Sequence, residues 1–442
     1  MLRGPRAIIP LLLLILVETG RCFMLPLRRA IGAGIMRGTR AAAGGAACMS
    51  SDEKEPMRVG VVGAGVAGCA LAKKLTEAGA HVTVFEMGRG AGGRMATRKT
   101  RDRPGLAINH GAPLFVATQD AFREMLAPLL ATGAVTKWQG RVVDIDGGDF
   151  RPKARALQGE GYVSSPDMNS MCEALVDGLD KRFSTQVAAI ERAGREWVLF
   201  GKDHNELGRF DWCVFTSHTC GHTRWQQVFG FAPPLCALAD KEPALKQIVE
   251  PLQSVESQAV MVAMVAFKKE DANAILSLDF DVAHVTNHPA LSRVVRHESG
   301  GGEHESFVSL CFHSTPEFAK KYEFVYGSTS AAAKLSADKW KSEENRMKEQ
   351  EVLAELMVAG KEVLLKLAVE APTPVFGPVL HRWGSAFTYS GDSPRVDEGL
   401  GLAVCGDFAG QESMDIYRGV ESAALSGLQV AQTILSSARA RL

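Results

Sequence analysis

The stretch VGVVGAGVAGCALAKKL (residues 59–75) decides the fold class. An apolar run leads into Gly63, Gly65 and Gly68, and residues with the apolar spacing of a helix follow. In this context GxGxxG indicates the first β-α-β unit of a dinucleotide-binding domain. We expect Gly63 to permit the tight turn, Gly65 to let the backbone approach a pyrophosphate, and Gly68 to let the helix pack closely on the strand.

The residues after this turn favour a bound ligand over a β-α-β unit without one. The N–H groups at the start of the helix, around Val66 and Ala67, would face the phosphates. Gly79 closes the predicted helix, and HVTVFE (residues 81–86) predicts the second strand. Glu86 ends that strand about 20 residues after the turn, where a carboxylate accepts hydrogen bonds from ribose hydroxyls.

The unit alone does not distinguish FAD from NAD, but the segments that follow do. GRGAGGRMATRKT (88–100) contains a second GxGxxG with no helix after it, and INHGAPLF (108–115) comes soon after. Together they resemble the cofactor loop of amine-oxidase-like and renalase-like flavoproteins. The resemblance implies that this loop wraps the FAD phosphates, and it assigns cofactor contacts to Gly93, Arg94, Met95, His110, Gly111 and Ala112.

A second cofactor segment is expected near the other end of the chain. LGLAVCGDFAG (400–410) is an apolar strand leading into Gly406-Asp407, and residues 415–435 predict a long helix with small residues on one face. In flavoproteins of this fold the Asp of such a pair binds the ribityl chain. The helix start near Val420 would point at the flavin pyrimidine and favour the anionic reduced flavin. The alternative is a buried strand and a packing helix with Asp407 as its cap.

The resemblance extends over nearly the whole body of the chain. VTKWQGRVVDI (135–145), GYVSSPDMNSMCEALV (161–176) and HRWGSAFTYS (381–390) match renalase-like segments in the same order. It implies that the backbone at Val187 lies against adenine. Two departures stand out: Asn109 replaces the acid that usually precedes His-Gly, and HTCGHTRW (218–225) replaces a proline-containing turn.

The predicted fold class is α/β, a Rossmann-like FAD-binding domain of the glutathione-reductase type with an inserted α+β substrate domain. We assign residues 57–115, 161–222 and 374–442 to the FAD-binding domain, and residues 116–160 and 223–373 to the substrate domain. In the latter, AVMVAMVAF (259–267) and SFVSLCFH (306–313) predict an antiparallel sheet. HESGGGEHES (297–306) predicts a loop or hairpin, and a long charged helix follows, with Gly360 as its C-cap.

The first fifty residues differ in composition from the rest. They contain seven Arg and one acidic residue, and Arg3 and Arg6 precede an apolar stretch, Ala7 to Val17, that is too short to span a bilayer. Residues 1–50 therefore predict a bipartite presequence, a signal peptide followed by a transit-like segment, and delivery to a plastid. A single signal peptide with a basic tail is the alternative, as are mitochondrial and secretory destinations.

The rest of the composition excludes several classes of protein. Lys+Arg and Asp+Glu number 50 each, which gives no reason to expect nucleic acid as a partner. Nine Cys show neither CxxC pairs nor zinc spacing, so neither a metal site nor a disulfide framework is predicted. No other apolar segment approaches 18 residues, so we expect no stable membrane insertion of the mature body.

Catalytic candidates come from HRW (381–383), because its strand leads back toward the cofactor domain. We expect Trp383 to stack on substrate, Arg382 to hold an anionic group and His381 to exchange a proton; Tyr417 is a further candidate. A purely structural role is the alternative for each. The resemblance implies hydride transfer to flavin N5 from a small reduced substrate, such as a dihydronicotinamide, with reoxidation by O2. An amine oxidase or desaturase acting on a plastid metabolite, or a flavin-binding assembly protein, are the alternatives.

Overall fold

The computed structural model describes residues 55–328, 330–335, 342–389, 395–409 and 416–440. The predicted presequence, residues 1–50, lies outside the described residues, as does Gly410 at the end of the second cofactor segment.

The first sheet is Rossmann-like. Within the described residues it has six strands, in the order β10 (Asp180–Arg182), β2 (His81–Phe85), β1 (Arg58–Val62), β14 (Trp212–Phe215), β21 (Leu402–Val404) and β20 (Arg395–Asp397). All neighbours run parallel except the edge strand β20. The central strands are continuous apolar runs because both faces of a parallel sheet are covered.

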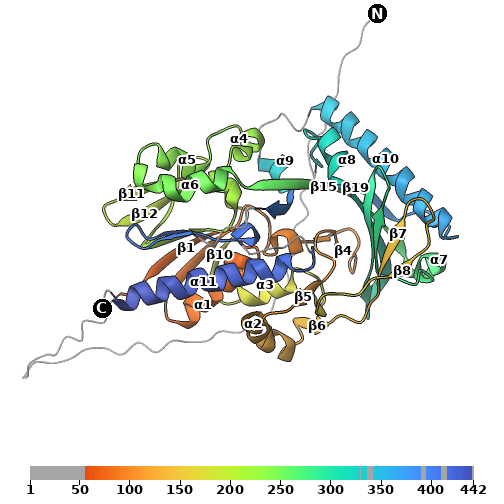
Figure 1. The fold of residues 1–442 in the computed structure, drawn as a ribbon, viewed down its shortest axis with the longest axis horizontal. Helices are drawn as coiled ribbons and strands as arrows, with labels where there is room; N and C mark the ends of the chain where they lie inside the picture. The colour runs from red at the N-terminus through yellow and green to blue at the C-terminus, as the bar shows by residue number, and fades with distance from the viewer. Residues whose placement is uncertain (1–54, 329, 336–341, 390–394, 410–415, 441–442) are drawn as a thin grey trace, which may run out of the picture. The chain divides into compact units, whose positions relative to one another are not determined.

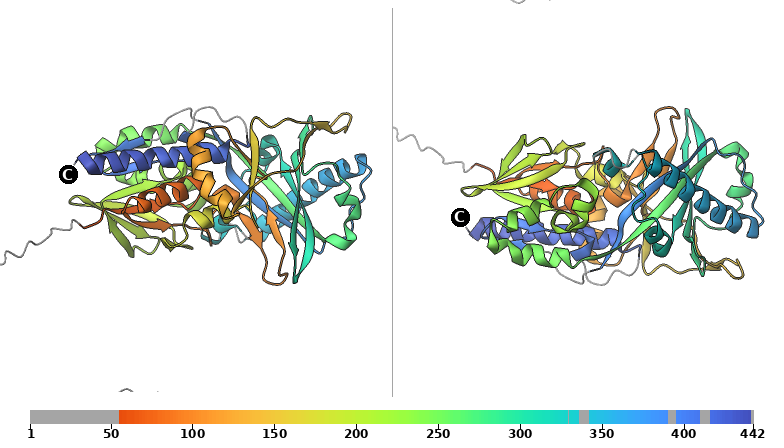
Figure 2. Two further views of the ribbon diagram at one scale, coloured as in Figure 1. Left: turned by 90° about the horizontal axis from the view of Figure 1, so that it is seen from below. Right: turned by 90° about the horizontal axis from the view of Figure 1, so that it is seen from above.

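Alternate residues of these strands face two different cores. Trp212 and Val214 pack with the helices α1 (Val66–Glu77), α3 (Ser170–Leu175) and α11 (Gly419–Ala440). Cys213 and Phe215 pack against the other layer. That layer comprises β11 (Val187–Ala193), β12 (Glu196–Gly201), β13 (Glu206–Phe210), α4 (Arg224–Phe229), α5 (Pro234–Ala239) and α6 (Lys246–Gln253). Figures 1 and 2 show the sheet between these layers.

Helices α1 and α11 lie side by side at backbone contact (Figure 2). A Cβ added at Gly427 would lie 2.2 Å from the carbonyl oxygen of Ala67. The small face predicted for the C-terminal helix is therefore what lets it approach the glycine-rich turn.

The second sheet is antiparallel apart from one parallel pair, β16 with β7. Its order within the described residues is β19 (Phe376–Tyr389), β15 (Glu256–Lys268), β18 (His304–Ser314), β17 (Leu291–Gly301), β16 (Val282–Thr286), β7 (Val142–Asp146) and β8 (Lys153–Ala154). The pairing of β15 with β18 confirms the predicted antiparallel sheet, and residues 297–306 form the β17–β18 hairpin.

The two faces of this sheet have different neighbours, as Figure 1 shows. The outer face packs against α7 (Asn273–Leu276), α8 (Pro316–Lys321) and α10 (Glu343–Lys366). The inner face packs against the segments that follow the glycine-rich loop. These include β3 (Thr97–Lys99), β4 (Ala107–Asn109) and β5 (Phe115–Ala117). β5 pairs with β9 (Glu160–Ser164), which also pairs with β6 (Val135–Lys137).

Three expectations differ from the structure. α2 (Asp120–Ala131) and the segment from α4 to α6 pack on the cores of the first sheet, although residues 116–160 and 223–373 were assigned to the substrate domain. β19, in contrast, starts inside the expected FAD-binding segment but belongs to the second sheet. Gly360 is not a C-cap: α10 continues to Lys366, and a Cβ at Gly360 would lie 2.6 Å from the Phe312 ring.

Candidate functional site

The glycine-rich turn has one open position between two closely packed ones. Gly63 has φ +113°, which disfavours any side chain, and a Cβ at Gly68 would lie 2.1 Å from the Gly63 carbonyl oxygen. At Gly65, which precedes α1, an added Cβ would meet no atom within 4 Å. The turn thus offers exposed backbone and the start of a helix at one place, which is the arrangement a pyrophosphate requires.

Glu86 ties the turn to the loop after β2. Its carboxylate accepts hydrogen bonds from the N–H groups of Ala64 (2.9 Å) and Gly88 (2.6 Å). Burial raises the pKa of Glu86, and these two N–H donors oppose that rise. The same carboxylate is therefore held beside the turn, at the position predicted for ribose. The Thr185 N–H donates a hydrogen bond to the Glu86 carbonyl. Because β11 begins two residues later, at Val187, this bond holds the start of β11 near Glu86.

The second glycine-rich segment lies against the first. The Gly92 N–H donates to the Ala64 carbonyl at 2.8 Å, and a Cβ at Gly93 would lie 3.1 Å from the Gly65 Cα. This contact brings the loop of residues 88–95 to the open side of the turn. Met95 is instead fully buried in the core beneath, so its side chain is a packing element.

An ion pair between Arg94 and Asp407 joins a loop near the beginning of the described chain to a turn near its end. Two guanidinium nitrogens donate to the two carboxylate oxygens at 2.6 and 2.5 Å, and Thr388 donates to the same carboxylate at 2.9 Å. Burial would raise the pKa of Asp407, but the positive charge of Arg94 holds it below its usual value. The side chain of Arg94 remains 40% exposed, and its Nη1 also donates to the Ala386 carbonyl at 3.3 Å.

The His-Gly-Ala segment supports this arginine from the other side. The Ala112 N–H donates to the Arg94 carbonyl at 3.0 Å, and a Cβ at Gly111 would clash with the same oxygen at 1.8 Å. Asn109, where the related proteins usually have an acid, accepts hydrogen bonds from Thr97 (2.7 Å) and from the Met168 N–H (3.2 Å). Asn109 therefore has a structural role in this chain.

Helix α11 is anchored both to the Gly406-Asp407 turn and to the residues that follow β5. The Gly406 N–H donates to Ser426 of α11 at 2.9 Å, and Val420 is buried in the first core. The carboxylate of Glu421 accepts from the N–H groups of Thr118 and Gln119 at 2.6 and 2.8 Å. Ser426 thus holds α11 beside Gly406, and Glu421 holds its first turn against Thr118 and Gln119.

The three catalytic candidates of β19 divide between the two faces of the second sheet. His381 and Trp383 lie on the inner face with His110: the Trp383 ring stacks on His110 with centroids 5.2 Å apart, and its Nε1–H donates to the His110 carbonyl at 2.9 Å. The His381 ring lies 4.7 Å from that of His110. Burial lowers the pKa of His110 to about 4 and also lowers that of His381, so both imidazoles are neutral near neutral pH.

Arg382 is placed differently from the expectation. Side chains alternate along a strand, so it projects to the outer face, where its guanidinium donates to the carbonyls of Ala319 (3.0 Å) and Tyr322 (3.3 Å). It therefore caps the end of α8 and does not reach the face shared by His381 and Trp383.

Comparisons with known proteins agree with this architecture. Residues 61–129 match the family model of the NAD(P)-binding Rossmann-like domain. The chain is similar to a "putative protoporphyrinogen oxidase" from Exiguobacterium sp. 255-15, with 13% identity over 85% of this chain and 99% of that one, and a TM-score of 0.53. The chain is also similar to a triple mutant of putrescine oxidase with redesigned cofactor binding, with 12% identity over 86% of this chain and 99% of that one, and a TM-score of 0.52. The chain shares the fold of these proteins. This confirms the predicted fold class.

Three residues that the sequence analysis did not select contribute to the site. Thr216, at the end of β14, donates to the carbonyls of Val62 and Gly63 and so holds the turn from below. Thr388 holds Asp407, and His218 lies in the unusual segment 218–225 with its Nε2 unpartnered among the described residues. Burial lowers the pKa of His218 to about 3. A hydroxyl directly after a buried strand was the available signal for Thr216.

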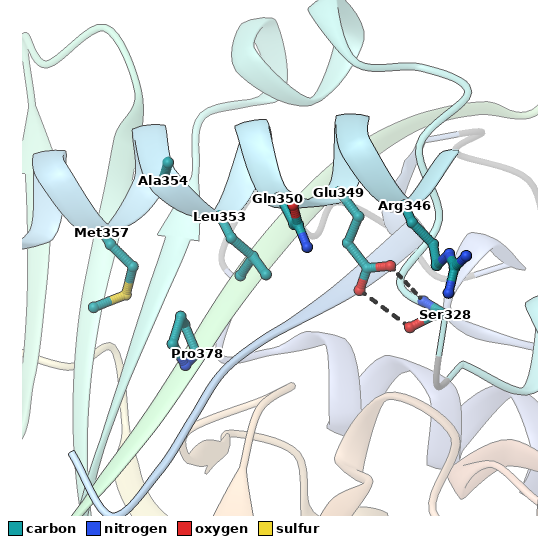
Figure 3. Close-up of a pocket in the computed structure, with 8 residues that line it drawn as sticks. All are labelled: Ser328, Arg346, Glu349, Gln350, Leu353, Ala354, Met357 and Pro378. Atoms are coloured by element: carbon teal, nitrogen blue, oxygen red, sulfur yellow. Dashed lines mark hydrogen bonds between the residues drawn. The ribbon is translucent and has the colours of Figure 1, made fainter. Parts of the chain in front are cut away.

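A hollow of about 520 Å³ lies elsewhere, between α10 and the outer face of the second sheet (Figure 3). Its lining includes Leu353, Met357 and Pro378, and Glu349 accepts hydrogen bonds from the N–H and hydroxyl of Ser328. None of the cofactor or catalytic candidates lines it. In the described part of the chain, no three His, Cys, Asp or Glu side chains are grouped as metal ligands, and no helix is both long and apolar enough to span a bilayer.

Proposed function

We propose that this chain is an FAD-dependent oxidoreductase of the renalase-like kind, which oxidises a small reduced substrate and returns the electrons to O2. The observation that carries the proposal is the Arg94–Asp407 ion pair, which brings the two predicted cofactor segments together beside the open turn at Gly65. The residues present fit a dinucleotide, because three kinds of group lie together there. These are backbone N–H groups, the Glu86 carboxylate, which can accept hydrogen bonds from ribose hydroxyls, and the half-exposed Arg94.

Each group has a distinct task in this proposal. Gly65 and the start of α1 would hold the diphosphate, Glu86 the adenosine ribose, and Arg94 the remaining phosphate charge. Asp407 would face the ribityl chain while keeping Arg94 in place. A bound flavin supplies the acceptor for the hydride that leaves the substrate.

On the substrate side, the chain contributes orientation and the exclusion of water. His110, His381 and Trp383 form an aromatic wall on the inner face of the second sheet. Such a wall stacks planar substrates, and it excludes water from the reacting carbon. Hydride loss from a dihydronicotinamide releases no proton, so no base is required, and we assign to the neutral His381 the positioning of the substrate ring within this wall.

Colour and cofactor analysis of the purified body, expressed from Ser51, test the cofactor assignment. We expect a yellow protein that releases FAD on denaturation, and colourless Gly65→Val and Asp407→Ala variants. Because Gly65 faces open space, Gly65→Val should retain the circular dichroism of the wild type. A folded variant with both substitutions that still binds FAD would contradict the site.

Anaerobic stopped-flow mixing distinguishes the substrate classes. Rapid bleaching by dihydronicotinamide isomers, followed by peroxide formation on admitting O2, is the expected result. Bleaching by amines or polyenes alone would favour an amine oxidase or desaturase acting on a plastid metabolite. A yellow protein that no reductant bleaches would favour a binding or assembly role.

We also propose that residues 1–50 direct the protein to a plastid. Fusion of this segment to a fluorescent protein should deliver the reporter to plastids, and deletion of Ala7 to Val17 should abolish delivery. Accumulation of the intact fusion in mitochondria or its secretion would contradict the proposal.

A further inference from the structure

Four side chains capable of positive charge lie in one row across the inner face of the second sheet. Val262 of β15 pairs with His381 on one side and with His313 on the other. His313 pairs with Arg293 of β17, and Arg293 pairs with His284 of β16. Directly paired residues of neighbouring strands project to the same face and lie about 5 Å apart. The sequence hides this row, because its members come from four separate strands.

The row faces the segments that carry the candidate cofactor site. Val262, which lies between His381 and His313 in the row, packs in the same inner core as Ile108, Val116 and Tyr417. The hydroxyl of Tyr417 is 2.6 Å from His284 Nε2, and Tyr417 lies two residues before α11. His381, at the other end of the row, contacts His110 and Trp383. The row therefore lines the inner face from the aromatic wall to the start of α11.

The two central members of the row, Arg293 and His313, are buried, and each has a nitrogen without a hydrogen-bond partner among the described residues. Arg293 is 5% exposed and His313 is 3% exposed. Among the described residues, Arg293 Nε and His313 Nε2 have no hydrogen-bond partner, and no carboxylate forms an ion pair with Arg293. The other arginine of β17, Arg296, pairs with Asp281 at 2.9 Å. Arg293 is thus the exception on its own strand.

Such a cation needs a counter-charge. A guanidinium stays protonated in proteins, and a buried charge without a partner destabilises the fold. Burial and the charge of Arg293 both lower the pKa of His313, which therefore stays neutral and offers an N–H. A fork of donors with a neutral N–H beside it suits a planar or tetrahedral oxyanion, and the guanidinium charge of Arg293 repels an ammonium group.

We propose that Arg293 and His313 bind an anionic group, carboxylate or phosphate, of the substrate. The inference rests on the proposed function in one respect, that the inner face is the substrate side of the flavin. It deepens that function by naming an acidic substrate class and by disfavouring cationic amines, the alternative raised for an amine oxidase.

Binding of four simple probes to the yellow protein tests this inference. Benzoate and phenyl phosphate carry the two candidate anions, benzamide is the neutral counterpart and benzylamine the cationic one. We expect benzoate or phenyl phosphate to raise the melting temperature and to perturb the visible flavin spectrum. Benzamide and benzylamine should bind at least 30-fold more weakly, as expected for loss of a charge-assisted pair. The stronger of the two anions identifies the group.

Variants then locate the binding. Arg293→Met should weaken the anionic probe about 30-fold, and Arg293→Lys should weaken it less, because charge remains without the fork. Arg382→Met, on the outer face of the same sheet, is the matched control and should leave the affinity unchanged. Equal affinity for benzamide and for the stronger of the two anions, or unchanged anion affinity in a folded Arg293→Met variant, would overturn the inference. A wild-type protein that binds no flavin would instead refute the proposed function. The two failures are distinguishable, because a melting-temperature shift reports anion binding even in a protein without flavin.

Discussion

The carboxylates that follow β2 and β21 in the first sheet have hydrogen-bond partners, whereas Arg293, near the start of β17 in the second sheet, has no carboxylate partner among the described residues. Glu86 accepts from two backbone N–H groups, and Asp407 accepts from Arg94 and Thr388. Arg293 is more deeply buried than Arg94, yet no described carboxylate pairs with it. The polar groups of the first region support one another before any ligand arrives, and those of the second do not.

This difference bears on how each region meets its ligand. A region with mutually bonded groups is already organised, so binding a cofactor there requires little rearrangement and gains affinity. A region with an unpaired charge is strained until an anion arrives, so the same interaction contributes both stability and selectivity. We therefore expect substitutions in the first region to change stability or cofactor retention, and substitutions at Arg293 to change which molecule binds.

The largest effect is expected at the glycine-rich turn. Gly68→Ala places a Cβ 2.1 Å from the Gly63 carbonyl, and separating the strand from the helix costs about 3 kcal/mol of unfolding free energy. Gly65→Ala has open space and an ordinary φ of −76°, so its stability should match that of the cofactor-free wild type. Urea unfolding measures both. Similar losses in the two variants would mean that Gly65 is not the open position.

A smaller loss is expected when Asp407 is changed to Asn. Arg94 then keeps its charge without a counterion, but it is 40% exposed, so about 2 kcal/mol is lost instead of the larger value of a fully buried pair. Asp211→Asn breaks the more exposed Arg58 pair and is the control, with an expected loss of under about 1 kcal/mol.

The pH dependence of unfolding checks the same ion pair. The pKa of Asp407 is lower in the folded state than its usual value of about 4, so the carboxylate stabilises the protein above that pH. The stabilisation is lost as the pH falls through the folded-state pKa. The difference between wild type and Asp407→Asn should therefore shrink in acid. A difference that stays constant would show that the carboxylate charge has no part in it.

Next in size is the contrast between the two arginines of the second sheet. Arg382→Met leaves the carbonyls of Ala319 and Tyr322 without their donor, which costs about 1 to 2 kcal/mol. Arg293→Met removes an unpaired buried charge, so stability without added anions should be unchanged or higher. Thermal and urea unfolding in anion-poor buffer compare them. Destabilisation of Arg293→Met by as much as Arg382→Met would mean that Arg293 already has a partner in the fold.

Local chemistry made much of the first region predictable. Each glycine of the turn is required for a separate steric reason. The position of Glu86 can be predicted from its spacing after the turn within one β-α-β unit. The helix of small residues also follows from its own sequence. Gly360 was misjudged because a glycine near a helix end and a glycine facing a large ring look alike in sequence, and only the position of Phe312 distinguishes them.

Predicting which side chains lie together in the second region requires the register of its strand pairings, which the sequence does not provide. The alternation of a strand separates Arg382 from His381 and Trp383, but it does not say which face meets the cofactor domain. His284 and Arg293 each interrupt an apolar run and His313 ends one, which is a visible signal of polar positions on these strands. Their meeting in one row needs two strand pairings, β16 with β17 and β17 with β18, and the registers of these pairings emerge only from the assembled sheet.

The smallest effect concerns tryptophans with and without a hydrogen bond. Trp383 donates to the His110 carbonyl at 2.9 Å, whereas Trp225 is buried with its Nε1 unpartnered among the described residues. Changing either to Phe removes a similar volume, so the difference between the two losses isolates the hydrogen bond and should be about 1 kcal/mol, with Trp383→Phe the less stable. Urea unfolding at neutral pH, where His110 is uncharged, measures it. Equal losses would mean that Trp383 is held by packing alone, and the aromatic wall would then be free to rearrange around a substrate.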